Sequence, residues 1–236
     1  MKPFKIYFLH HSGFLVETDR AVLVFDYYRD PLHVVESVLS RQETVNKKVY
    51  FFVSHVHGDH FNPQIRLYEE RASAYFMHED CHMLLNHGEK CHLMKPGDSF
   101  SGDDFSVKMY GSTDAGGSFI VWIGDNTIFH AGDLNWWHWA GEPDENNEEA
   151  AELFFEELKK IEETRVDLAF IPVDYRQQTA REWGVKEYLK RMDIGLLVPM
   201  HYFGTPWIPS YEFRWLHRKQ RIWIPLSDGD EIRGEW

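Results

Sequence analysis

The stretch SHVHGDHFNP, residues 54–63, places three histidines and one aspartate within six consecutive positions. The KVYFFVS segment that leads into it is a continuous apolar run, typical of a strand buried on both faces. His55 and His57 stand two residues apart after that strand, so both imidazoles can turn toward one point, and Asp59 and His60 follow. Imidazole and carboxylate groups suit zinc, iron or manganese. The pattern predicts a metal-binding loop rather than a polar loop with incidental histidines.

The rest of the first third predicts strands followed by one helix. FKIYFL (4–9), GFLVE (13–17) and AVLVFD (21–26) are short β-branched and aromatic runs separated by turn residues. LHVVESVLSRQ (32–42) carries apolar residues at three-to-four spacing, which predicts a helix.

The later sequence first continues with strands and then alternates helices with strands. DDFSVKMYG (103–111), GGSFIVWIG (116–124) and NTIFHAGD (126–133) predict three strands. NNEEAAELFFEELKKIEE (146–163) predicts a helix that Asn146 or Asn147 caps. Strand VDLAFIPVD, helix AREWGVKEYLKRM and strand IGLLVPMH follow. Two sheets with helices packed outside them are expected.

Composition limits the class of protein. The 236 residues are 43% hydrophobic and 16% aromatic, which suits a single globular domain over residues 1–236. The N-terminal apolar run is short and interrupted by histidines, which does not favour a signal peptide, and no stretch reaches the roughly 18–20 apolar residues of a membrane span. We therefore expect a cytoplasmic protein with no membrane partner.

The charge balance bears on partners. A formal net charge of −13 lacks the electrostatic attraction that nucleic acid requires, so a nucleic-acid partner is not expected and a small-molecule substrate is. The basic, aromatic segment EFRWLHRKQR (212–221) is interpreted as a surface helix. The aromatic segment PWIPSYEFRW and the tryptophans near residue 137 either roof a pocket or form a homo-oligomer contact.

The two cysteines, Cys81 and Cys91, are interpreted as reduced thiols. A small zinc site with His78 and His87 stays an alternative, although neither C-x-x-C nor H-x-x-H spacing is present. Six histidines carry no pattern and are interpreted as surface or core residues: His33, His78, His82, His87, His92 and His217.

Four short motifs, taken together and in this order, resemble the metallo-β-lactamase-fold superfamily. They are VLVFD ending in Asp26, the H-x-H-x-D-H loop, HAGD ending in Asp133 and VPMH ending in His201. The resemblance implies an α/β fold (α+β in some schemes): a four-layer αβ/βα sandwich of two mixed sheets with helices on the outer faces. It also implies that Asp26 supports the metal loop from behind the ligands, that Asp133 bridges two metals, and that His201 binds the second metal.

The chain departs from the family pattern at one position. Family members place a histidine before a Gly-Ser segment, and GSTDAGGSFIV has Asp114 where that histidine is expected. Asp114 either binds metal through an oxygen or leaves the first site with two protein ligands. Ligation by Asp114 makes manganese or iron more plausible than a three-histidine site would.

Two segments resemble the ascorbate-phosphate-lactonase-like branch of the superfamily: HHSGFLVE, with His11, and HAGDLNWWHW, with His138. His11 is interpreted as a pocket residue or a structural histidine. His138 lies among tryptophans that include Trp136 and Trp137, and these are interpreted as a substrate-pocket wall, with core packing or a subunit contact as the alternatives. His130 is interpreted as a second-layer residue behind the metal or as packing.

The resemblance and the ligand set lead to a mechanism and to alternatives. Two divalent ions, zinc first and manganese or iron as alternatives, would share a hydroxide that attacks an ester, lactone or phosphoester bond of a small polar substrate. One site would use His55, His57 and Asp114, and the other would use Asp59, His60 and His201. Asp133 would touch both ions, and Asp59 or His138 would protonate the leaving group. An iron-dependent oxidoreductase or dioxygenase, a nuclease-type phosphodiesterase and a non-catalytic metal-binding protein are the alternatives.

Overall fold

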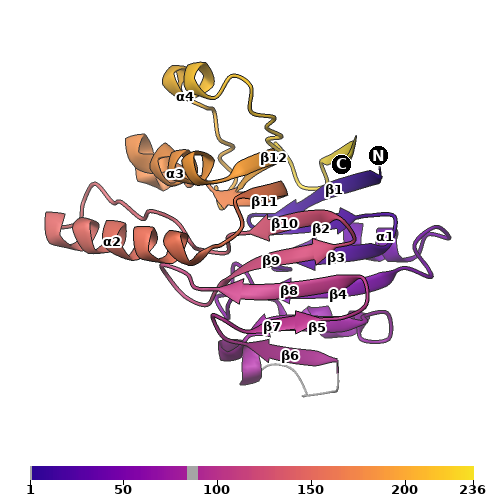
Figure 1. Ribbon diagram of the computed structural model, residues 1–236. Helices are drawn as coiled ribbons and strands as arrows, with labels where there is room; N and C mark the ends of the chain where they lie inside the picture. Colours follow the sequence, from indigo (N-terminus) through magenta and orange to yellow (C-terminus); the bar gives the residue numbers. More distant parts are fainter. Residues whose placement is uncertain (1, 84–89) are drawn as a thin grey trace. The chain divides into compact units, whose positions relative to one another are not determined.

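The computed structural model describes residues 2–83 and 90–236. The chain divides into two compact units, each with its own β-sheet: unit 1 comprises Met1–Lys95 and Pro225–Trp236, and unit 2 comprises Pro96–Ile224. Figure 1 follows both along the chain by colour. The expectation of a single domain over residues 1–236 stays a prediction.

Unit 1 is built on a seven-stranded sheet with the order β13-β1-β2-β3-β4-β5-β6. Its strands are β1 (Pro3–His10), β2 (Gly13–Glu17), β3 (Ala21–Phe25), β4 (Lys48–Val53), β5 (Ala74–His78), β6 (Cys91–Met94) and β13 (Glu231–Glu235). Its helical segments are α1 (Val34–Leu39), η1 (Pro63–Tyr68) and η2 (Glu79–Met83). Strands β13 to β3 pair antiparallel, and β3 to β6 pair parallel.

The parallel strands β3 and β4 of unit 1 are buried because both of their faces carry apolar side chains. All five residues of β3 are buried, and Phe25 pairs with Phe52 across the sheet, where their rings stack 4.7 Å apart. Burial of one such ring contributes roughly 1.5–3 kcal/mol. This packing holds the carboxyl ends of β3 and β4 side by side.

Helix α1 is shorter than the predicted span 32–42, and side chains explain both of its ends. The buried Asp30 carboxylate accepts hydrogen bonds from the amides of Val34 and Val35, which starts the helix two residues late. The Thr44 hydroxyl donates to the backbone oxygen of Val38, so the last turn is capped from outside the helix.

Unit 2 is built on a six-stranded sheet with the order β12-β11-β10-β9-β8-β7. Its strands are β7 (Ser99–Ser101), β8 (Phe105–Tyr110), β9 (Ser118–Ile123), β10 (Asn126–His130), β11 (Arg165–Pro172) and β12 (Asp193–Met200). Its helical segments are α2 (Asp144–Lys160), η3 (Tyr175–Glu182), α3 (Trp183–Arg191) and α4 (Tyr211–Leu216). Strands β10, β11 and β12 pair parallel, and the others pair antiparallel.

The predicted cap of the long helix α2 is wrong. The helix begins at Asp144 with Pro143 before it, and the N-cap makes no side-chain hydrogen bond. Asn147 lies inside the first turns, where its amide group bonds both the N–H and the C=O of Trp139. The Asn147 side chain, which was predicted to cap the helix, instead fixes the backbone of the loop at Trp139.

The other predicted strands and helices are observed in kind, whereas strands β5, β6, β7 and β13 were not predicted from the sequence. The two predicted mixed sheets are confirmed, and the C-terminal basic segment contains the short helix α4, with Tyr211, Trp215 and Leu216 exposed. Within residues 2–83 and 90–236, none of the helices has the length and apolar character needed to cross a bilayer.

Candidate functional site

The H-x-H-x-D-H loop of unit 1 leaves β4 and gathers its imidazoles closely. The ring of His55 lies 4.5 Å from that of His57 and 4.2 Å from that of His60, measured between centroids. His55 and His60 are buried, whereas His57 is exposed. The turn is held by backbone hydrogen bonds from His60 and Phe61 to the carbonyl of His57. The loop therefore presents several ring nitrogens to one small volume.

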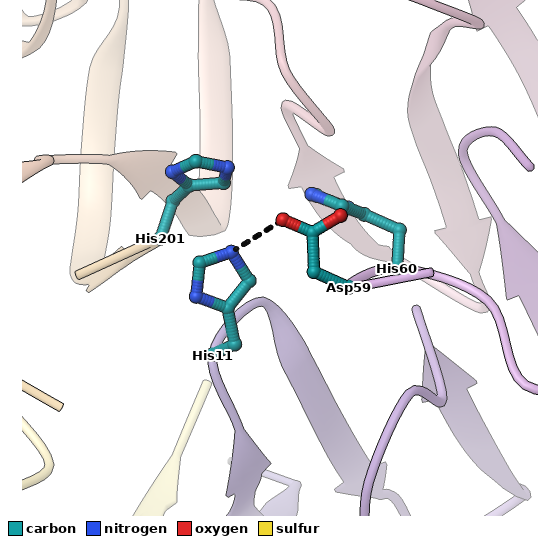
Figure 2. A group of neighbouring side chains, drawn as sticks. All are labelled: His11, Asp59, His60 and His201. Atoms are coloured by element: carbon teal, nitrogen blue, oxygen red, sulfur yellow. Dashed lines mark ion pairs between the residues drawn. The ribbon is translucent and has the colours of Figure 1, made fainter. Parts of the chain in front are cut away.

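His11 joins this cluster from the turn between β1 and β2. Figure 2 shows its Nε2 directed at Asp59, and the two atoms of the ion pair, Nε2 and Oδ2, are 3.6 Å apart. His11, Asp59 and His60 each offer a ligand atom, and these atoms lie within 4.8 Å of one another. Sequence reasoning left His11 open between pocket and structural roles, and the structure places it beside two predicted ligands.

Asp26 lies immediately after β3, and its buried carboxylate organises the loop. Oδ1 accepts from the amide of Ser54 at 2.7 Å, and Oδ2 accepts from the Ser54 hydroxyl and from His60 Nδ1, each at 2.7 Å. Because His60 donates through Nδ1, its Nε2 keeps the lone pair that a metal ligand needs. Asp26 thus fixes the tautomer of a predicted ligand.

Ser54 extends the influence of Asp26 to a second histidine. The Ser54 hydroxyl has one proton, which it donates to Asp26, so its oxygen accepts from His55 Nδ1 at 2.9 Å. His55 Nε2 then carries the lone pair. Sequence reasoning missed Ser54, although its place directly before the first histidine of the loop was a visible signal.

Three residues of these clusters adopt the left-handed backbone region that non-glycine residues rarely occupy. The φ angles are 56° at His11, 41° at Asp26 and 62° at His201. The backbone packs closely beside Asp26, because a Cβ added at Gly13 would come within 2.9 Å of the Asp26 carbonyl oxygen, so position 13 requires glycine. Strained residues of this kind concentrate at functional sites.

In unit 2, Asp133 and His201 follow two strands of the parallel part of the sheet. Asp133 comes three residues after β10, and His201 comes directly after β12. Both are buried, and Asp133 Oδ1 lies 3.4 Å from His201 Nε2. The two residues that the resemblance made ligands on this part of the chain are therefore close enough to share one ion.

Asp174, which follows β11, is a neighbour of His201 that sequence reasoning missed. Its Oδ2 lies 3.1 Å from His201 Nδ1, and its carboxylate also accepts from the Arg176 side chain, with 2.6 Å between Arg176 Nη2 and Oδ2. Burial alone would raise the pKa of the Asp174 carboxyl, but hydrogen bonds from His201 and Arg176 hold that pKa below its ordinary value. Asp174 is therefore a buried carboxylate in its charged form.

Aromatic rings surround His201. Trp137 and Phe203 each have a ring centroid 5.3 Å from the His201 ring, and Trp137 stacks on Trp139 with an interplanar angle of 4°. The Arg176 guanidinium carbon lies 4.1 Å from the Phe203 ring centroid. The indole N–H of Trp137 donates to the backbone oxygen of Asp133, so this predicted wall residue also holds the turn of a ligand.

Trp136 and His138 point to other neighbours. The Trp136 ring contacts Phe155 of α2 and Trp183 of α3, at centroid distances of 5.0 and 5.1 Å. His138 packs on the same Trp183 at 4.6 Å. The described contacts of both residues are with helices of unit 2, and their predicted roles in a pocket or in proton transfer stay predictions.

Asp114 lies exposed in the loop between β8 and β9. Its neighbour Thr113 anchors that loop, because the Thr113 hydroxyl bonds the backbone oxygens of Asp133 and Asn135 and accepts from the Asn135 amide. The loop is thereby tied to the turn that carries Asp133. Whether Asp114 is a ligand stays a prediction.

Among the described residues, His130 and the two cysteines lie outside these clusters. His130 is buried in β10, where Nδ1 accepts from the amide of Gly132 and the ring faces Phe170. Cys81 is a buried free thiol whose pKa is raised by burial, and Cys91 is a free thiol in β6. His87 lies outside the described residues, as does the side chain of His82, so the alternative Cys-His zinc site is not tested.

The donors fit a divalent transition metal. Neutral imidazole nitrogens and carboxylate oxygens are the ligands that zinc, iron and manganese take in proteins. His60 and His201 each engage a buried carboxylate through Nδ1, the arrangement that orients metal-binding histidines. The chemistry of both donor sets therefore suits such an ion.

Comparisons with known proteins agree with this chemistry. Residues 5–201 match the model of the family described as "Beta-lactamase superfamily domain". A UPF0173 metal-dependent hydrolase of Desulforamulus reducens is 26% identical over 221 residues, covering 86% of each chain.

Solved structures share the fold. Igni18, a metallo hydrolase from Ignicoccus hospitalis, aligns with a TM-score of 0.62 at 18% identity over 99% of both chains. The metallo-beta-lactamase fold protein YhfI from Bacillus subtilis aligns with a TM-score of 0.62 at 13% identity, over 99% of this chain and 100% of the other. At these identities the structures establish the fold alone, and they confirm the predicted fold class.

The family model covers most of the chain, and its span includes every residue that sequence reasoning named as a ligand, from His55 to His201. By sequence and by fold, the chain belongs to the β-lactamase superfamily.

Proposed function

We propose that the protein cleaves an ester, lactone or phosphoester bond of a small polar substrate, and that two divalent ions would supply the hydroxide for this reaction. The observation that carries the proposal is the loop after β4, where closely packed imidazoles have their Nδ1 atoms engaged by Asp26 and Ser54. This arrangement leaves Nε2 of His55 and His60 as ligand atoms.

The chain is a metallo-hydrolase, in line with its family and with relatives that are named metal-dependent hydrolases. The bond that it cleaves is the finer part of the proposal. A net charge of −13 and the lactonase-like segments around His11 and His138 favour a small polar molecule over nucleic acid. The predicted cytoplasmic location belongs to the same proposal.

The proposed ligands are those that the sequence predicts. His55, His57, Asp59, His60, Asp133 and His201 would bind the ions, with Asp114 as a further ligand. Zinc is proposed first, and manganese or iron are the alternatives. When bound, such ions lower the pKa of coordinated water to about 7, which makes hydroxide available at neutral pH.

Asp59 is proposed to move the proton, and His11 is proposed to orient Asp59. Asp59 has a side chain that is 33% exposed, so it can reach a substrate as well as an ion. We propose that Asp59 accepts the proton that the attacking water loses and passes it to the leaving group, while His11 Nε2, 3.6 Å from the Asp59 carboxylate, holds the orientation of that carboxylate. His138 is the alternative proton donor.

The test is removal and return of metal. Protein stripped with a chelator is reloaded separately with zinc, manganese or iron, and each form is assayed on a lactone, a carboxylic ester, a phosphomonoester and a phosphodiester. We expect hydrolysis of one class that disappears with the metal and returns with it. His57→Ala should lack this activity, and His217→Ala, a change near the end of α4, should keep it.

Two results would overturn the proposal. Full turnover by the metal-free protein would exclude the mechanism. Stoichiometric iron that undergoes redox change, with oxygen uptake and no hydrolysis, would instead support the iron-dependent oxidoreductase.

A further inference from the structure

His201 forms a buried ion pair with Asp174, and the proposed reaction assigns no role to Asp174. His201 and Asp174 side chains are 4% and 0% exposed, and His201 Nδ1 lies 3.1 Å from Asp174 Oδ2. A carboxylate only accepts hydrogen bonds, so Nδ1 must donate, and the His201 lone pair is then on Nε2. That nitrogen is the one 3.4 Å from Asp133 Oδ1.

Arg176 fixes the Asp174 carboxylate in turn. Arg176 Nε lies 3.0 and 2.9 Å from the two oxygens, Nη2 lies 2.6 Å from Oδ2, and the Arg176 amide donates to Oδ1 at 2.8 Å. A planar guanidinium that bonds both oxygens sets the rotation of the carboxylate, which a lysine cannot do. The acceptor presented to His201 is therefore fixed in direction.

Aromatic rings hold Arg176 in place. Its guanidinium carbon lies 4.1 Å from the Phe203 ring centroid and 5.5 Å from that of Trp139. Such contacts favour a cation and restrict a long side chain that is 44% exposed. The Phe203 ring also meets the His201 ring edge to face, so the same residue contacts the arginine and the histidine.

We propose that Asp174 and Arg176 are positioning residues that hold His201 in the Nδ1–H tautomer and direct its Nε2 to the ion. The roles assigned to Asp174 and Arg176 rest on one part of the proposed function, which is that His201 is a metal ligand. The tautomer is a property of the metal-free protein and is measured independently.

The first experiment reads the tautomer. Metal-free protein with ¹⁵N-labelled histidines is examined by NMR at a pH where the imidazoles are neutral, and the His201 signals are assigned by their loss in His201→Asn. We expect an Nδ1–H imidazole in the wild type. In Asp174→Asn, an amide of equal size can donate to Nδ1, so a shift toward the Nε2–H form is expected.

The second experiment measures zinc affinity by competition with a chelator. Loss of a group that orients a ligand typically costs 10- to 100-fold, so we expect about that loss for Asp174→Asn and a smaller loss for Arg176→Met. Arg218→Met is the matched control, because Arg218 also lies over a tryptophan, Trp215 at 5.6 Å, and should bind zinc like the wild type. If Asp174→Asn does not fold, Arg176→Met and Arg176→Lys are measured in its place. Both keep the Asp174 carboxylate as the acceptor for His201 Nδ1, so we expect the wild-type tautomer and a loss of zinc affinity smaller than about 10- to 100-fold.

The outcomes separate the two claims. A wild-type tautomer together with wild-type zinc affinity in the Asp174 and Arg176 variants would overturn the positioning role. If His201→Asn binds zinc like the wild type, His201 is not a ligand, and the proposed site fails even where the tautomer shift is found. Shifts in tautomer and affinity without hydrolysis of any substrate would support the positioning role and refute the proposed reaction.

Discussion

Asp26 in unit 1 and Asp174 in unit 2 each orient a predicted ligand histidine, but they have different hydrogen-bond partners. Each follows a strand of a parallel pair, each is fully buried, and each contacts Nδ1 of a predicted ligand histidine. The donors described around Asp26 come from Ser54 and His60, whereas Asp174 also bonds the guanidinium of Arg176.

This difference decides how each carboxylate responds to change. Ser54 and His60 are buried, so the network around Asp26 is closed to water and every donor lost leaves a buried group unsatisfied. Arg176 is partly exposed, so solvent and salt reach the pair at Asp174. Unit 1 should therefore tolerate changes behind its ligands less well than unit 2.

Removal of one ligand from each unit should produce the largest effect. His57→Ala and Asp133→Ala are each expected to abolish hydrolysis and lower the bound metal while the fold survives, because each removes a proposed ligand. Activity assays, metal analysis and circular dichroism provide the measurements. If Asp133→Ala kept its activity and its metal, the assignment of Asp133 as a ligand would be wrong.

The comparison itself is tested by Asp26→Asn beside Asp174→Asn. We expect each variant to lose about 10- to 100-fold in metal affinity. Asp26→Asn should also lose a further roughly 1–3 kcal/mol in the free energy of unfolding, because the amide cannot satisfy all of the buried donors. Chelator competition and urea denaturation measure the two effects. Equal losses in the free energy of unfolding would show that the buried network around Asp26 is no more sensitive to substitution than the pair at Asp174.

Ser54 offers a finer test within unit 1. Ser54→Ala removes the hydroxyl between Asp26 and His55 and should lower stability by about 1–3 kcal/mol and weaken metal binding. Ser54→Thr keeps the hydroxyl and should restore metal binding. Chelator competition measures the metal affinity of the two variants. Equal metal affinity in both would show that the Ser54 hydroxyl does not help to orient His55.

The smallest effect is expected from Arg176→Lys. The change keeps the charge of a side chain that is partly exposed, so the free energy of unfolding should fall by less than about 1 kcal/mol. Urea denaturation at low and high salt measures it, with Arg218→Lys as the control. A loss of several kcal/mol would mean that the Asp174 pair behaves as a closed network.

Local patterns allowed much of the fold to be predicted. The buried strands before Asp26 and His55 are apolar runs that need no distant contact to be seen, and they were found at nearly their observed bounds. Helix ends were less accurate, because Asp30 and Thr44 set the limits of α1 from outside it. The cap of α2 was predicted wrongly because Asn147, a residue type that often caps helices, bonds the backbone of the loop at Trp139 instead.

Asp174 and Arg176 could not be predicted, for a physical reason. An aspartate at the end of a strand is an ordinary turn residue, and its partner His201 lies 27 positions further along the chain. Only the parallel pairing of β11 with β12 brings the two strand ends together. The signal in the sequence was that Asp174 follows a predicted strand, as Asp133 and His201 do. The structure shows that these three strands are parallel neighbours.

The left-handed backbone at His11, Asp26 and His201 bears on the choice of probe substitution. Alanine at such a position removes the side chain and also keeps the unfavourable φ, so its effect mixes chemistry with backbone strain. Glycine adopts these angles readily, and asparagine adopts them more readily than most residues. Glycine is therefore the deletion that isolates the side chain, and random libraries at Asp26 should be enriched in asparagine and glycine among variants that still fold.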